Sequence, residues 1–164
     1  MVGPKIFLCK TITQAQKLQI HNLWNTEYPK NLKHESLEEF ENYLWNLKTK
    51  YHVLLLDDNV KVLGWLFVFV REKEVWFAMI LDSKIQGKGF GTKLLNFAKK
   101  KEPILNGWAV DHNNYQLSSG KPYQSPVGFY LKNGFLTEAK TRIETPKLSA
   151  IKIRYESQSN FNNN

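Results

Sequence analysis

Cysteine is nearly absent from this chain of 164 residues, since Cys9 is its only thiol. A lone thiol cannot close a disulfide within the chain, so the fold cannot depend on such a cross-link. This composition suits a reducing compartment, and we expect a cytoplasmic protein.

Long hydrophobic runs are missing as well. The most apolar stretch, residues 62–70, is far shorter than the ~20 residues that a helix needs to cross a bilayer. The N-terminal segment MVGPKIFLCK lacks the apolar run of a secretory signal. We therefore expect no membrane partner.

Acidic residues are scarce relative to basic ones, with 15 Asp and Glu against 23 Lys and Arg and a net charge of +8. Such an excess favours an anionic partner, namely nucleic acid, acidic lipid or a phosphorylated ligand. It is equally compatible with a lysine-rich surface that keeps a protein in solution. The lysines gather at residues 99–101, but no arginine-rich or basic-aromatic pattern surrounds them, so we expect no nucleic-acid partner. His, Cys and acidic residues show no metal-ligand spacing, and we expect no metal.

The chain contains alternating helical and strand-like segments without a visible repeat. Its length fits one domain, because domains commonly hold about 100–200 residues. We expect a single domain over residues 1–156, followed by a disordered polar tail over residues 157–164. The state of association is open between a monomer and a homodimer.

Local signals predict the order of the elements. Capping-box patterns at Thr13 and Ser36 predict two helices, and a third helix is expected from Phe90. A short fourth helix is expected with Ser125 as its cap and Pro126 at its first position. Apolar segments that favour strands are residues 6–10, 51–56, 61–70, 75–81, 104–110, 135–143 and 149–155. This order predicts an α/β fold with a mixed sheet.

Three closely spaced glycines, Gly87, Gly89 and Gly91, separate the strand expected at residues 75–81 from the third helix. The first N–H groups of a helix lack partners and attract anions, and glycine lets a phosphate approach the backbone closely. The spacing G-x-G-x-G differs from the dinucleotide fingerprint and from the nucleotide-triphosphate loop. Taken alone, it is also compatible with a tight turn that binds nothing.

The glycine segment QGKGFG at residues 86–91 resembles the Q/R-x-x-G-x-G/A signature of the GNAT acetyltransferase superfamily. A second segment, GFYLKNGF at residues 128–135, resembles the F-Y-x-x-x-G-F segment of the same superfamily. The order of the elements agrees over nearly the whole chain. The resemblance implies a central mixed, mostly antiparallel sheet of about seven strands flanked by four helices, in which the fourth and fifth strands splay apart.

The resemblance also implies that acetyl-CoA is the cofactor. Main-chain groups of Met79, Ile80 and Leu81 would bind its pantetheine arm in the gap between the splayed strands. The pyrophosphate would be held by a loop consisting of Gln86, Gly87, Lys88, Gly89, Phe90, Gly91 and Thr92. Glutamine stands at a position where the superfamily more often has arginine.

Acetyl transfer to an amine needs a base, an oxyanion partner and an acid. The motif position of Tyr130 implies the acid, since a phenol with a pKa near 10 is protonated at neutral pH. By the same resemblance, a main-chain N–H near Leu81 would stabilise the oxyanion. His112 has a suitable pKa range for the base, while Asp111, Glu27 and a water relay are alternatives.

The acceptor would be a small-molecule or peptide amine such as an amino acid, a polyamine, an aminoglycoside or a protein terminus. Glu27, Tyr28, Trp108 and Asp111 are the residues that we expect to bind it, with aromatic walls and a carboxylate for the cationic amine. The aromatic residues are equally compatible with loops that they simply pack down. A module that binds acyl-CoA without catalysis is the alternative function.

Overall fold

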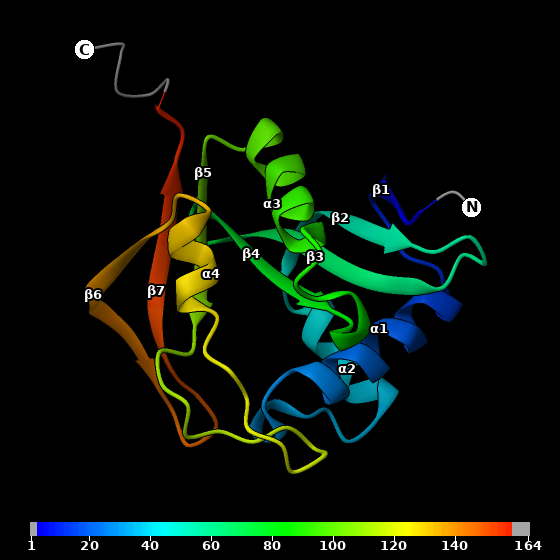
Figure 1. The fold of residues 1–164 in the computed structure, drawn as a ribbon, viewed down its shortest axis with the longest axis horizontal. Helices are drawn as coiled ribbons and strands as arrows, with labels where there is room; N and C mark the ends of the chain where they lie inside the picture. The colour runs from blue at the N-terminus through cyan, green and yellow to red at the C-terminus, as the bar shows by residue number, and fades with distance from the viewer. Residues whose placement is uncertain (1–2, 159–164) are drawn as a thin grey trace.

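The structure is a computed structural model that describes residues 3–158. Its strands form one sheet in the order β1-β2-β3-β4-β5-β7-β6 (Figure 1). The strands are β1 (Lys5–Cys9), β2 (Lys48–Leu56), β3 (Val62–Arg71), β4 (Glu74–Leu81), β5 (Ile104–Ala109), β6 (Leu136–Glu144) and β7 (Ser149–Glu156). The helices are α1 (Gln14–Glu27), α2 (Leu37–Trp45), α3 (Phe90–Lys101) and α4 (Val127–Lys132), with short 3-10 turns η1 (Lys30–Leu32) and η2 (Ser83–Ile85). The expected fold class and element order are confirmed.

One pair of neighbouring strands determines the shape of the sheet. β4 and β5 run parallel and share a single registered pair, Trp76 with Asn106, whereas every other neighbouring pair of these strands is antiparallel. Beyond this pair the two strands diverge, as Figure 1 shows. The predicted splay is confirmed, and it leaves one edge of β4 without a strand neighbour.

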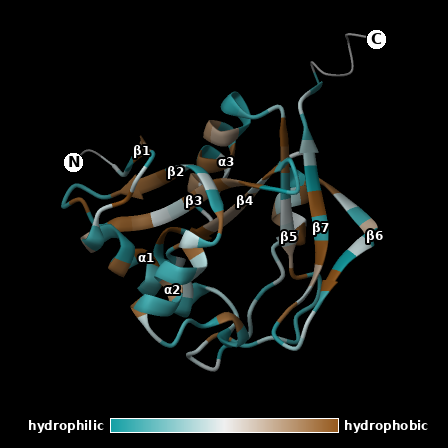
Figure 2. Cartoon of the chain, turned by 180° about the vertical axis from the view of Figure 1, so that it is seen from behind, coloured by the Kyte–Doolittle hydropathy of each residue, from teal (hydrophilic) through white to brown (hydrophobic). Residues whose placement is uncertain are grey.

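Helices cover both faces of the sheet. On one face, Leu66 and Val68 pack in a core with residues of α3 and α4. On the other face, Trp65, Phe67 and Phe69 pack with residues of α1 and α2, and Figure 2 shows those two helices in front of the brown, apolar strands. Because successive side chains of a strand point to opposite faces, an unbroken apolar strand such as β3 can serve both cores.

The helix starts agree closely with the sequence. Thr13 accepts the N–H of Gln16 and the Gln16 side chain accepts the N–H of Thr13, so the expected capping box is formed. Ser36 accepts the N–H of Glu39 at 3.1 Å. The reciprocal bond of the second box is missing, because the Glu39 carboxylate accepts the N–H of Glu35 instead.

The start of α4 differs from the expectation. Pro126 occupies the cap position and the helix begins at Val127, one residue later than predicted. The hydroxyl of Ser125 donates to the carbonyl of Val110 at 2.5 Å and lies 3.4 Å from the N–H of Val127. Ser125 therefore fastens the loop to the end of β5 as well as facing the helix.

The end of the chain is described only in part. The N–H of Ser157 donates to the carbonyl of Pro103 at 2.7 Å, so the expected tail begins with an anchored residue. Residues 159–164 of that tail lie outside the described residues. None of the helices among residues 3–158 is long and apolar enough to cross a membrane.

Candidate active site

Along the edge of β4 that borders the gap in the sheet, every second residue directs its main-chain N–H and C=O groups into the gap. The hydroxyl of Tyr28 donates to the carbonyl of Met79 at 3.0 Å, and the side-chain amide of Gln86 donates to the carbonyl of Leu81 at 2.8 Å. Both carbonyls therefore point away from β3. Since main-chain groups alternate along a strand, Ile80 directs its own toward β3, and its side chain packs in the core on the α1/α2 face of the sheet.

The glycine turn leads from β4 to α3 through left-handed backbone. Gly87 has φ 76° and Gly89 has φ 89°, while a Cβ atom on either residue would meet nothing within 4 Å. Glycine is therefore required at these two positions by the left-handed backbone conformation and not by the closeness of neighbouring atoms. Gly89 caps α3 without a side-chain hydrogen bond, so the first N–H groups of that helix remain available for an anion.

Gly91 has a different role in the first turn of α3. A Cβ atom there would lie 2.9 Å from the Cζ atom of Phe129, which belongs to α4. The missing side chain allows the Phe129 ring to pack directly on the helix. The third glycine of the motif thus joins the anion site to the helix that carries Tyr130.

A cavity of about 690 Å³ runs along these elements. Its size falls in the range of roughly 300–1,000 Å³ that is typical of small-molecule sites. It brings together most of the residues that the sequence predicted for the site. Those that line it are Met79, Ile80, Leu81, Gln86, Gly87, Gly89, Gly91 and Thr92 from the expected cofactor set, together with Glu27, Tyr28, Trp108 and Tyr130. Lys88 and Phe90 lie in the same turn but do not line the cavity.

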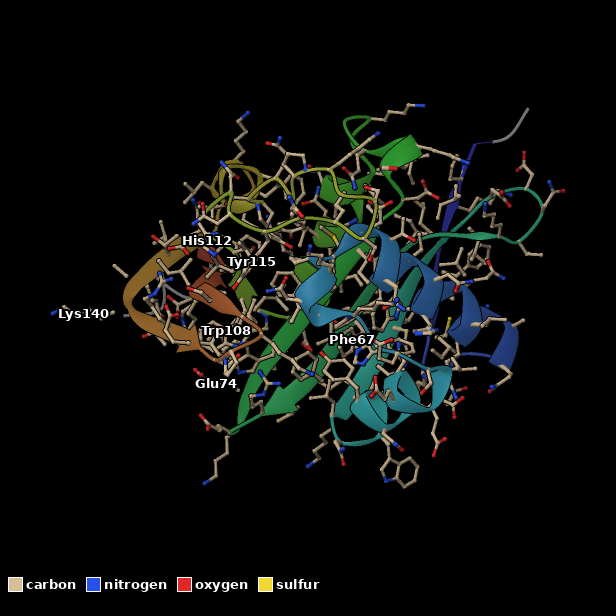
Figure 3. All side chains as sticks on the ribbon, turned by 90° about the horizontal axis from the view of Figure 1, so that it is seen from below. Phe67, Glu74, Trp108, His112, Tyr115 and Lys140 are labelled. Atoms are coloured by element: carbon tan, nitrogen blue, oxygen red, sulfur yellow. The ribbon has the colours of Figure 1, made fainter. Side chains whose placement is uncertain are left out.

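Asp111 and His112 do not line the cavity either. Asp111 accepts two hydrogen bonds from the guanidinium of Arg142, at 2.6 and 3.1 Å, and these bonds hold the pKa of its carboxyl below the usual value. The ring of His112 lies edge-on to that of Tyr115 at 4.5 Å, and its Nδ1 accepts the main-chain N–H of Asn114. Figure 3 labels these two neighbouring rings. Each of these two side chains contacts its own loop or β6 outside the cavity, and their expected roles stay predictions.

Tyr130 lies in α4 with only 7% of its surface exposed. Its ring packs edge-on against those of Phe77 and Phe135, at 5.8 and 5.4 Å. Burial raises the pKa of Tyr130 well above its ordinary value, and the nearby Tyr123 adds to this effect. A phenol in this setting stays protonated and can donate a proton.

Glu27 is the carboxylate that lines the cavity. It is the last residue of α1, and it accepts the main-chain N–H of Ser83 at 3.1 Å and the side-chain amide of Gln86 at 3.4 Å. Desolvation raises the pKa of Glu27, although the hydrogen bond from Ser83 opposes this shift. A carboxyl group with a raised pKa accepts a proton more readily than an exposed one.

Arg71 and Trp76 are among the residues of the cavity that were not predicted from the sequence. Arg71 ends β3, and its guanidinium lies 5.1 Å from the ring of Phe69 and 5.4 Å from that of Trp76. Both Arg71 and Trp76 line the cavity. The available signal was a lone arginine directly after an apolar strand, but only the β3–β4 pairing shows that it meets the site.

A glycine-capped helix beside a split between parallel strands, with a buried phenol across the gap, is the arrangement of a CoA-dependent acyltransferase. Residues 49–136, more than half of the chain, match the family model described as the acetyltransferase (GNAT) domain. The chain belongs to the GNAT acetyltransferase family.

Solved structures of the family share the fold with this chain. YhbS of Escherichia coli in complex with CoA has a TM-score of 0.64 at 13% identity, with 99% of this chain and 86% of that chain covered. Spermidine/spermine N-acetyltransferase SpeG of Vibrio cholerae has a TM-score of 0.60 at 17% identity, with 96% of both chains covered. A protein assigned as a phosphinothricin N-acetyltransferase has a TM-score of 0.68 at 16% identity, covering 94% of this chain and 99% of that one. No curated protein sequence matches this chain.

Proposed function

We propose that the protein is an N-acetyltransferase that moves an acetyl group from acetyl-CoA to a primary amine by direct transfer in a ternary complex. The observation that carries this proposal is one cavity that connects the glycine turn with the buried phenol of Tyr130 along the open edge of β4. Family membership supports the reaction, and the CoA complex of YhbS and the spermidine named for SpeG support the two substrates.

The residues at the gap fit coenzyme A. The main-chain N–H groups from Gly87 to Thr92 would hold its pyrophosphate, since this segment combines left-handed glycines with a helix start. Lys88 and Phe90 would contribute through the main chain, and the net charge of +8 favours an anionic ligand. Met79 and Leu81 would offer main-chain groups to the pantetheine arm, as their carbonyl directions indicate.

Bound acetyl-CoA supplies a thioester whose carbonyl carbon accepts the amine nitrogen as the C–S bond breaks. Tyr130 would donate its proton to the departing sulfur. Main-chain N–H groups of Met79 or Leu81 would stabilise the charge that develops on the carbonyl oxygen. Glu27, which lines the same cavity, would take the proton that the amine loses through a chain of water molecules. Asp111 and His112 do not line the cavity, so the proposal gives neither of them a step.

Calorimetry with coenzyme A and thiol release from acetyl-CoA across a panel of amines test this function. The proposal expects binding of coenzyme A together with amine-dependent release of free thiol. Binding without turnover of any amine would favour a module that senses acyl-CoA. Absence of binding at ordinary ionic strength would overturn both functions.

A further inference from the structure

The acceptor end of the cavity combines aromatic walls with a guanidinium. Phe69 and Trp76 are direct partners in the β3–β4 register, and Arg71 lies over both rings. The ring of Trp76 in turn lies 5.2 Å from that of Trp108 on β5. An arginine that stacks over aromatic rings is restrained in position, which suits it to recognise a ligand group.

This guanidinium lies near the reaction centre but on the other face of the sheet. Trp76 directly precedes Phe77, whose ring contacts that of Tyr130 at 5.8 Å. Because neighbouring side chains of a strand point to opposite faces, Trp76 belongs to the α1/α2 face and Phe77 to the α3/α4 face. The cavity joins the two faces where β4 and β5 diverge, so a short molecule can reach from one to the other.

The donors at this end of the cavity lack acceptors. Within the described residues, the side chain of Arg71 forms no ion pair and no hydrogen bond, and the indole N–H of Trp76 is buried without a partner. The carboxylate next to it in the hairpin, Glu74, is instead paired with Arg154 at 3.0 Å and Lys152 at 3.6 Å. A buried donor is normally satisfied, so the indole N–H of Trp76 lacks an acceptor, and the half-buried guanidinium beside it is free to pair with the same anionic group of a ligand.

The distribution of charge in the cavity indicates the kind of ligand. Among the described residues that line it, Glu27 and Arg71 are the charged ones. Glu27 bonds to Ser83 beyond the end of β4, whereas Arg71 contacts Trp76 near its start. The main-chain positions of Trp76 and Leu81, which bracket this part of β4, are separated by ~16 Å of extended strand, at ~3.3 Å per residue. A polyamine carries positive charge along its length. In this cavity one end would be attracted by the carboxylate of Glu27, but the other would be repelled by the guanidinium of Arg71.

We propose that the acceptor amine also carries a carboxylate, which Arg71 and the indole N–H of Trp76 bind, so that the substrate class is amino acids with an apolar or aromatic body. This inference rests on the proposed acetyl transfer. The carboxylate supplies the acceptors that the two donors lack, while the aromatic walls cover the body of the molecule. The amine then faces the gap, where Tyr130 and the open edge of β4 lie.

Matched acceptors test the proposal in a thiol-release assay. Phenylalanine is compared with phenylalaninamide and 2-phenylethylamine, which keep the amine and the ring but lack the carboxylate. Spermidine serves as the polyamine acceptor in the same assay. Loss of a charge-assisted hydrogen-bonded pair predicts a kcat/KM about 10- to 100-fold lower for the two analogues. Arg71→Gln is expected to remove this difference, whereas Lys73→Asn, which deletes an exposed charge of the same hairpin, is expected to keep it.

A second readout does not depend on acetyl-CoA. Trp76 and Trp108 line the cavity, so binding of N-acetylphenylalanine should change tryptophan fluorescence in the wild type and in Lys73→Asn, but not in Arg71→Gln. Equal turnover of phenylalanine and its decarboxylated analogue, or a preference for spermidine, would overturn the inference while leaving acetyl transfer intact. Carboxylate-dependent fluorescence without any turnover would instead support the site and count against the proposed reaction.

Discussion

The hydroxyl of Tyr28 donates a hydrogen bond of 3.0 Å to the main-chain carbonyl of Met79, 51 residues further along the chain. Tyr28 caps the C-terminal end of α1, and Met79 lies on the edge of β4 that has no strand beside it. A main-chain carbonyl inside a protein needs a partner, which a neighbouring strand would usually supply. The phenol takes that place and fastens α1 to the rim of the gap.

Replacement of Tyr28 by phenylalanine should therefore lower the free energy of unfolding by about 1–3 kcal/mol, because the Met79 carbonyl is left without its donor. Denaturation in urea, with and without coenzyme A, measures the change. Tyr123→Phe is the matched control, since Tyr123 lines the same cavity but its hydroxyl makes no hydrogen bond within the described residues. Equal losses in the two variants would contradict this role of Tyr28.

The glycines of the turn predict two different defects. Gly89→Ala forces a side chain into φ 89° and should cost about 1–3 kcal/mol of stability from backbone strain alone. Gly91→Ala should displace the Phe129 ring, because its Cβ would lie 2.9 Å from that ring. A second substitution, Phe129→Leu, should recover stability in the Gly91 variant and not in the Gly89 variant. Urea denaturation of the four variants measures this, and recovery in both would exclude the packing explanation.

Local chemistry made much of this fold predictable. The Thr13 box, the stop of α1 before Pro29 and the glycine turn all depend on residues within a few positions of one another. The buried face of α3 was less predictable. The spacing of Phe90, Leu94, Phe97 and Lys101 predicts one helical face, but the buried residues are Gly91, Leu94, Leu95 and Ala98, and Phe90 and Phe97 are only partly buried. The buried face of α3 is wider than the predicted one because the helix packs on a sheet, and the periodicity of the helix alone does not show what it packs on.

The site was predictable only where its residues belong to motifs. The sequence around Asp111 predicts a carboxylate that can attract an amine, because its partner, Arg142, is 31 residues away on β6. Arg71 looked like the end of a strand, and it becomes part of the site only through the cross-strand pairing of Phe69 with Trp76. Contacts between distant segments decide both cases, and no local pattern encodes them.

Tyr130→Phe should lower kcat by about 10²- to 10⁴-fold, the usual contribution of a general acid. The dissociation constant of coenzyme A should stay nearly unchanged, because the phenyl ring keeps its packing on Phe77 and Phe135. Since burial raises the pKa of Tyr130, the wild-type rate should not fall with pH through deprotonation of this phenol near its ordinary value. Stopped-flow thiol release and calorimetry measure the two quantities. An unchanged kcat would remove Tyr130 from the reaction.

A buried histidine far from the gap predicts how stability depends on pH. The indole N–H of Trp65 donates to Nδ1 of His52 at 3.0 Å, so this nitrogen is an acceptor and the imidazole is neutral. Burial lowers the pKa of His52 from 6.5 to about 4. Between these values the unfolded chain binds the proton and the folded chain does not. The free energy of unfolding should therefore fall as the pH drops through this window, by about 3 kcal/mol in total.

Substitution of His52 isolates this effect. His52→Gln can still accept the Trp65 N–H but cannot be protonated, so its urea midpoint should depend less on pH than that of the wild type between pH 6.5 and 4.5. Desolvation also lowers the pKa of His34, so the variant keeps a part of the dependence of stability on pH. The raised pKa of Glu27 acts in the opposite sense, because it makes the folded protein more stable as the pH falls toward 4.5. The lowered pKa values of Asp111 and Glu144 act mainly below this window and add to the slope only near its lower end, equally in the variant and the wild type. Parallel pH profiles of the variant and the wild type would show that His52 is not the titrating group.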